Sequence, residues 1–83
     1  MTNLTTLSLT RYELTLLARA LSESASEAYA DERLHVAREE HRFAARLWVA
    51  AGSHDMALHA SALAEAIDNE LIELAAGNTE ETV

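Results

Sequence analysis

Residues 31–51, DERLHVAREEHRFAARLWVAA, decide the fold because they make up most of a helix predicted over residues 27–51. Apolar positions recur here at steps of three and four, the spacing that places side chains on one side of a helix. One such side consists of Leu34, Ala37, His41, Ala44, Trp48 and Ala51, and a second of Tyr29, Val36, Phe43, Leu47 and Ala50. A helix with two apolar sides contacts two neighbours. We therefore predict that it lies between two other helices, or that it also contacts a second copy of the chain.

The start of the first helix is marked by a capping box. Thr10 lies three residues before Glu13, so each side chain can accept a hydrogen bond from the backbone N–H of the other residue. The end of this helix is ambiguous, because three serines within residues 22–26 compete for backbone hydrogen bonds. Two interpretations follow: a break near residue 24, or one continuous helix over residues 11–51.

Glycines mark the later helix ends. Gly52 is predicted to end the central helix, and Ser53 to cap a third helix over residues 54–76. A second glycine follows that helix, so residues 77–83 are predicted to be a disordered acidic tail, and the Thr-rich residues 1–9 a loose arm. The apolar seam of the third helix consists of Met56, Ala60, Leu63, Ile67, Leu71 and Leu74.

Composition favours a small helical protein. The chain has no proline and only two glycines, and it is rich in Ala, Leu, Glu and Arg, which are strong helix formers. We predict one all-α domain over residues 1–83, with a short first helix followed by an antiparallel hairpin of two longer helices. The absence of cysteine excludes disulfides as reinforcement for so small a core. Because the hairpin carries more apolar sides than one copy can cover, we predict a homodimer.

The net charge of −8 argues against nucleic-acid binding, since an acidic chain repels the phosphate backbone. All six basic residues are arginines before residue 47, whereas acidic residues continue to the C-terminus. This acidic C-terminal part would suit a basic protein surface, or it simply keeps a small protein soluble. No run approaches the ~20 apolar residues of a membrane span, and the N-terminus lacks a signal-peptide pattern. A cytoplasmic location is therefore expected.

Large aromatic residues dominate many protein contacts, so we predict Phe43, Leu47 and Trp48 as the main contact with a partner or a second copy. The other predicted contact residues are His41, Glu65, Asp68 and Ile72. The arginines spaced four apart in the central helix are predicted to pair with acids of their own helix, or with the acidic third helix of a second copy.

Glu32 and His35 form a Glu-x-x-His motif, and Glu39 follows four residues later. On a continuous helix the three would share one side, and burying them would be costly unless a metal or a partner satisfied them. In this limited respect the segment resembles the ferritin-like superfamily, particularly its short two-helix members, which dimerise to complete their site. The resemblance implies an iron-binding helical assembly with these three ligands. The alternative interpretation is a solvated glutamate beside a surface histidine, with no cofactor.

No pattern in the chain indicates catalysis, because it has no cysteine nucleophile, no glycine-rich phosphate loop and no G-x-S-x-G motif. We predict a non-enzymatic interaction protein that binds a larger protein through a helical face and modulates or inhibits it. Small acidic helical chains without cysteine often occur as accessory proteins of phages and mobile elements, where they inhibit host regulators, nucleases or motors, an analogy of type rather than of motif. The alternative is the ferritin-like assembly, whose enzymatic activity would be ferroxidase-like. A purely structural oligomer is a third possibility.

Overall fold

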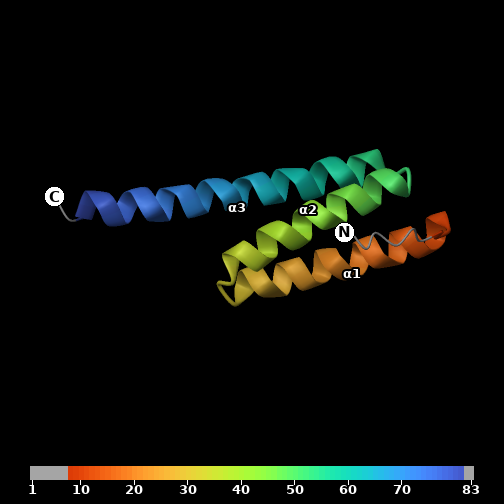
Figure 1. Cartoon of the computed structure of the whole chain (residues 1–83), viewed down its shortest axis with the longest axis horizontal. Helices are drawn as coiled ribbons and strands as arrows, with labels where there is room; N and C mark the ends of the chain where they lie inside the picture. The colour runs from red at the N-terminus through yellow and green to blue at the C-terminus, as the bar shows by residue number, and fades with distance from the viewer. Residues whose placement is uncertain (1–7, 82–83) are drawn as a thin grey trace, which may run out of the picture.

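The computed structural model describes residues 8–81, with side chains up to residue 76, and within this range the chain is entirely helical apart from its turns. The helices are α1 (Arg11–Ala30), α2 (Leu34–Ala50) and α3 (His54–Glu81). Figure 1 shows α2 between the other two, with the chain reversing its direction at each connection. The predicted all-α class is therefore confirmed for the described residues.

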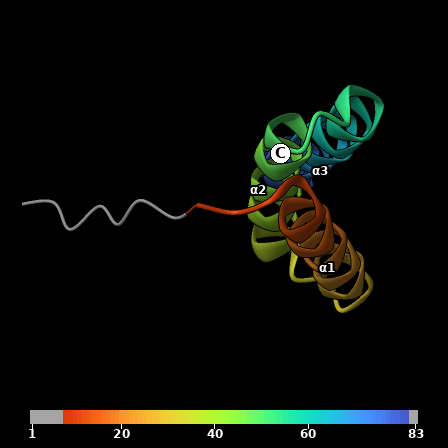
Figure 2. The same ribbon diagram turned by 90° about the vertical axis from the view of Figure 1, so that its right-hand side faces the viewer.

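The three helices form an open V rather than a closed bundle. Both α1 and α3 pack along α2, but they hardly meet each other. In the end-on view of Figure 2, α1 and α3 extend away from α2 in different directions. The radius of gyration is 15.4 Å, whereas a compact chain of this length would have about 12 Å.

The start of α1 follows the predicted capping box. The Thr10 Oγ1 accepts the Glu13 N–H at 3.1 Å, and the Glu13 carboxylate accepts the Thr10 N–H at 2.8 Å. These two bonds satisfy donors that the first helical turn cannot satisfy itself.

The expected break near residue 24 is wrong, and so is the alternative of one helix over residues 11–51, because α1 ends at Ala30. The helix continues through the three serines, and two of their hydroxyls have hydrogen-bond partners. Ser26 donates to the Ser22 carbonyl at 3.1 Å, and Ser24 donates to the Glu40 carboxylate of α2 at 2.6 Å.

Both interhelical turns have the same Schellman hydrogen bonds. At the first, the N–H of Arg33 reaches the Ala28 carbonyl at 2.8 Å; at the second, the N–H of Ser53 reaches the Trp48 carbonyl at 2.8 Å. The residue with positive φ is Glu32 (61°) in one turn and Gly52 (83°) in the other. The sequence predicts only the second turn, because glutamate is an unusual residue for this conformation.

Two further helix predictions need correction. The first helix is not short, since α1 has 20 residues and α2 has 17. The predicted end of the third helix at Gly77 is wrong, because α3 continues to Glu81. Most of the predicted arm, residues 1–7, and the last two residues of the predicted tail lie outside the described residues.

The buried core consists mainly of alanine. It contains Trp48, Ile67 and the alanines at positions 18, 25, 28, 37, 44, 45, 51, 57, 60 and 64. Alanine lets helices approach closely but buries little apolar area, so it contributes little transfer free energy. The other large apolar residues of the described chain are left at least partly exposed, among them Leu17, Tyr29, Val36, Phe43, Leu63, Ile72 and Leu74.

The positive φ of Glu32 leads to a stability prediction. Replacing Glu32 by glycine removes the steric cost of the left-handed conformation and should raise the free energy of unfolding by about 1 kcal/mol in urea denaturation. The matched control is Gly52→Ala in the equivalent turn, which should lower it by about the same amount. A Glu32→Gly variant that is no more stable than the wild type, measured beside a Gly52→Ala variant that is destabilised, would contradict the assignment of strain to Glu32.

Candidate functional site

A long groove lies between α1 and α3, with α2 as its floor. It comprises three adjoining cavities of about 670, 280 and 230 Å³. Ser26 of α1 lines all three, while Trp48 and His41 of α2 each line two. We call this feature the α1–α3 groove; it exists because the two outer helices pack on α2 and not on each other.

The two walls of the α1–α3 groove differ in chemistry. The α1 wall is polar and combines small serines with charged side chains, whereas the α3 wall is mainly apolar, with Met56, Leu63 and Ile67 beside the polar His59 and Glu70. These three apolar residues belong to the seam predicted for the third helix. That seam is wider than α2 can cover, so Ile67 is buried against α2 while Met56 and Leu63 remain exposed in the groove.

The floor of the groove contains two buried polar atoms without hydrogen-bond partners. Trp48 and His41 are each 4% exposed, and neither the Trp48 Nε1 nor the His41 Nδ1 has a partner. An unsatisfied buried polar group costs about 1–3 kcal/mol. Because the indole N–H is a donor only, anything that satisfied it would have to present an acceptor.

Burial disfavours the charged form of His41. Burial lowers the pKa of the His41 imidazole from its usual 6.5, and the nearby His59 lowers it further, whereas Glu40 opposes the shift. His59 lines the same cavity from α3. A neutral imidazole can donate from one ring nitrogen and accept at the other, so His41 can complement either type of group.

A hydrogen bond across the groove joins α1 to α3 directly. The Tyr29 hydroxyl donates to the Glu70 carboxylate at 3.0 Å, and this bond, with the carboxylate charge, raises the pKa of Tyr29. Both residues line the cavity that also contains His41 and Leu63. The bond lies at the end of α1 next to the first turn, and therefore limits the groove on that side.

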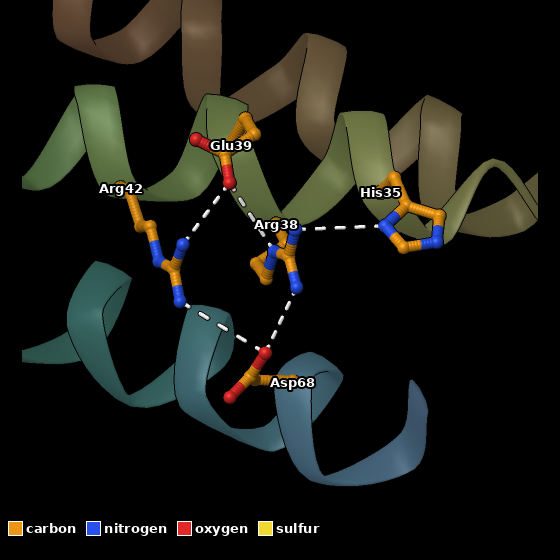
Figure 3. A network of polar contacts seen from close by, with 5 residues as sticks. All are labelled: His35, Arg38, Glu39, Arg42 and Asp68. Carbon is orange, nitrogen blue, oxygen red and sulfur yellow. Dashed lines mark hydrogen bonds and ion pairs between the residues drawn. The ribbon is translucent and has the colours of Figure 1, made fainter. Parts of the chain in front are cut away.

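On the other side of the α2–α3 seam, arginines connect the two helices (Figure 3). Arg38 binds the Asp68 carboxylate at 2.9 Å, and Arg42 lies 3.9 Å from the same oxygen. Both arginines also contact Glu39, at 3.2 and 3.0 Å. The predicted pairing within the central helix is thus present, and the bonds to the third helix lie within one chain.

The residues predicted to contact a partner lie on three separate surfaces. His41 and Trp48 form the groove floor. Phe43 and Leu47 belong to the predicted second side of the central helix, where Phe43 is exposed and Leu47 half-buried. Glu65, Asp68 and Ile72 share one side of α3 by their spacing, with Asp68 bonded to Arg38.

The geometry expected for the iron-site alternative is not formed. Glu32 lies in the turn before α2 rather than on a helix with His35. The Nδ1 of His35 lies 3.5 Å from an Arg38 nitrogen, and Glu39 is paired with two arginines. Among residues whose side chains are described, no three or more His, Asp or Glu gather in a way that could hold a metal ion.

Sequence reasoning did not identify the groove walls. The spacing of Ser22 and Ser26 could have indicated a side of α1 made of small polar residues, and the width of the third-helix seam could have indicated an uncovered strip. Helical spacing shows that an apolar side is wide. It does not show which neighbouring helix covers each half of that side.

Comparisons with protein-family models, characterised proteins and solved structures found no match to this chain. None of the helices, over the part of the chain that the structure describes, has a stretch long and apolar enough to span a bilayer.

The lowered pKa of His41 predicts how stability depends on pH. Above the unfolded-state pKa of 6.5, the neutral His41 side chain does not reduce the free energy of unfolding. As the pH falls from there through the lower folded-state pKa, the unfolded chain takes up a proton first, so the free energy of unfolding decreases. In urea denaturation at about pH 7.5 and 5.5, the wild type should lose more stability than His41→Gln. The exposed His35→Gln serves as the matched substitution control, and an unchanged slope in His41→Gln would contradict the prediction.

The burial of Trp48 predicts a large cost of truncation. Trp48→Ala removes the largest side chain of the core and should cost about 3–5 kcal/mol in unfolding free energy, followed by circular dichroism in denaturant. A loss below about 1 kcal/mol would show that Trp48 is not packed as described.

Proposed function

We propose that this chain is a non-enzymatic interaction protein that binds a helical segment of a larger protein in the α1–α3 groove and thereby modulates that protein. The observation that carries the proposal is the pair of buried, unpartnered polar atoms on an otherwise largely apolar floor, the Trp48 Nε1 and the His41 Nδ1. Because neither atom has accessible surface in the free chain, a bound segment with one hydrogen-bond acceptor would satisfy the indole N–H only after a small shift of the groove walls uncovers it, and would then gain affinity from that bond.

The shape of the groove suits a helix. Packed helices lie 8–10 Å apart, and two helices that flank a third leave the fourth position of a bundle open. On the α3 wall, Met56, Leu63 and Ile67 are spaced seven and four apart, the spacing of residues that pack against a helix lying alongside. The serines of the α1 wall would let the backbone of the incoming helix approach closely.

Charge supports a basic partner. The chain has a net charge of −8, and no basic residue other than histidine follows residue 46. Such a field accelerates encounter with a positively charged protein and is screened by salt. The predicted contact through Glu65 would lie with Ile72 on the outer side of α3, and it is separate from binding in the groove.

The test is affinity capture from cells that produce the protein, with two matched charge substitutions on α3. Leu63→Glu places a carboxylate in the groove, whereas Ile72→Glu places one on the outer side of the same helix, where the native side chain is 59% exposed. A stoichiometric partner should bind the wild type and Ile72→Glu alike, and should bind Leu63→Glu at least about tenfold more weakly.

A second variant excludes a general effect of charge or unfolding. Ser26→Phe should obstruct the groove without adding charge, because Ser26 lines all three cavities. The emission of Trp48, the sole tryptophan, should shift when the purified partner is titrated into the wild type but not into this variant. Loss of binding in Ile72→Glu alone would move the site to the outer side of α3 and refute the groove.

We also propose that the working form is a homodimer in which the antiparallel hairpin of the second and third helices forms the rigid part. The support is the amount of apolar surface that the chain leaves uncovered. Phe43, Leu58 and Ile72 are each more than half exposed, and they lie on different sides of the molecule from the groove floor. A single copy of a small alanine-rich core gains limited stability, so association would add burial that the fold itself lacks.

A further inference from the structure

The side of α2 away from the groove carries three apolar residues at strict seven-residue spacing. These are Val36, Phe43 and Ala50, and all three are exposed. We call this the Phe43 face. A seven-residue repeat keeps side chains on one line along a helix, and such a line favours packing against a second helix.

We propose that the Phe43 face is the contact between two copies of this chain, in which the two α2 helices pair antiparallel about a two-fold axis at Phe43. This inference rests on the proposed homodimer and adds its surface, its direction and its register. The axis would place Phe43 against the partner's Phe43, and Val36 against the partner's Ala50. In this isologous contact the large Phe43 side chains meet at the axis, and each medium-sized Val36 packs against the partner's small Ala50.

The charges beside the Phe43 face favour the antiparallel direction. Arg46 follows Phe43 by three residues, and Glu39 and Glu40 precede it by four and three. Antiparallel pairing about Phe43 therefore brings each Arg46 level with the Glu39–Glu40 pair of the other copy. Parallel pairing would instead bring Arg46 beside the partner's Arg46, which is repulsive.

Two features of the single chain agree with this pairing. Arg46 forms no ion pair with any residue whose side chain the structure describes. Glu39, although bonded to Arg38 and Arg42, keeps its side chain 60% exposed and open to a cation from the second copy. A large aromatic residue at the centre, with charges at the rim, is the usual arrangement of a protein contact.

The first test is the mass of the full-length protein in solution, by light scattering coupled to size exclusion. The wild type should have twice the chain mass of 9.1 kDa. Phe43→Asp should give the monomer mass with unchanged helical content, because Phe43 is 54% exposed and does not support the core. Leu58→Asp, at a position 71% exposed on α3, is the matched control and should remain dimeric.

The second test fixes the direction and register, using the fact that the chain has no cysteine. Val36→Cys and Ala50→Cys are prepared as separate proteins and oxidised alone or mixed. The proposed register predicts a disulfide-linked dimer only in the mixture, because position 36 faces position 50 of the other copy. Self-linkage of Val36→Cys would show parallel pairing and overturn the register.

A charge-reversal pair tests the role of Arg46. Arg46→Glu should raise the dimer dissociation constant about tenfold or more, and adding Glu39→Arg should restore most of the loss, since both symmetric pairs are then reversed. A wild-type monomer would overturn both the homodimer and this inference. A dimer that Phe43→Asp leaves intact would overturn only the Phe43 face, and neither result bears on whether the α1–α3 groove binds a partner.

Discussion

The structure depends on alanine-mediated packing of α2 against both of its neighbours. Ala18 and Ala44 on one side, and Ala45 and Ala60 on the other, belong to one buried cluster around Trp48. Small side chains allow close helix approach, but they bury little apolar surface, and the larger residues are displaced to the outside. The open V, the long α1–α3 groove and the exposed Phe43 face are all consequences of this one arrangement. A fold with this much uncovered apolar surface would bury more of it by binding another protein chain.

The α1–α3 groove is the part of this uncovered surface that carries specific polar groups. The unpartnered Trp48 and His41 both line the floor, while the mainly apolar wall of α3 faces a polar wall of α1. A merely hydrophobic groove would accept many helices, whereas a buried donor discriminates against any helix that lacks an acceptor at the matching position. The Arg38–Asp68 bond holds α2 and α3 together on the opposite side of their seam, which keeps the apolar wall in place.

Local signals predicted much of the fold. The capping box at Thr10 and the glycine turn at Gly52 are present as expected, and the side of the central helix from Leu34 to Ala51 is the one that packs inward. The first turn was not predicted because Glu32 occupies a position that usually signals itself by glycine. The serines of α1 suggested a break because the tertiary partner of Ser24, Glu40, cannot be inferred from local sequence. For the site, the sequence identified Trp48 and His41 as residues of interest, but helical spacing could not show that they form the floor of a groove.

The most direct measurement of the central claim is the indole N–H signal of Trp48 in an ¹H–¹⁵N spectrum, recorded without and with the captured partner. The chain has a single tryptophan, so one resonance reports on the groove floor. The account predicts that this resonance shifts and that its exchange with solvent slows when the partner binds, because the N–H gains an acceptor. An unchanged indole signal, together with shifts confined to the outer side of α3 around Glu65 and Ile72, would contradict it.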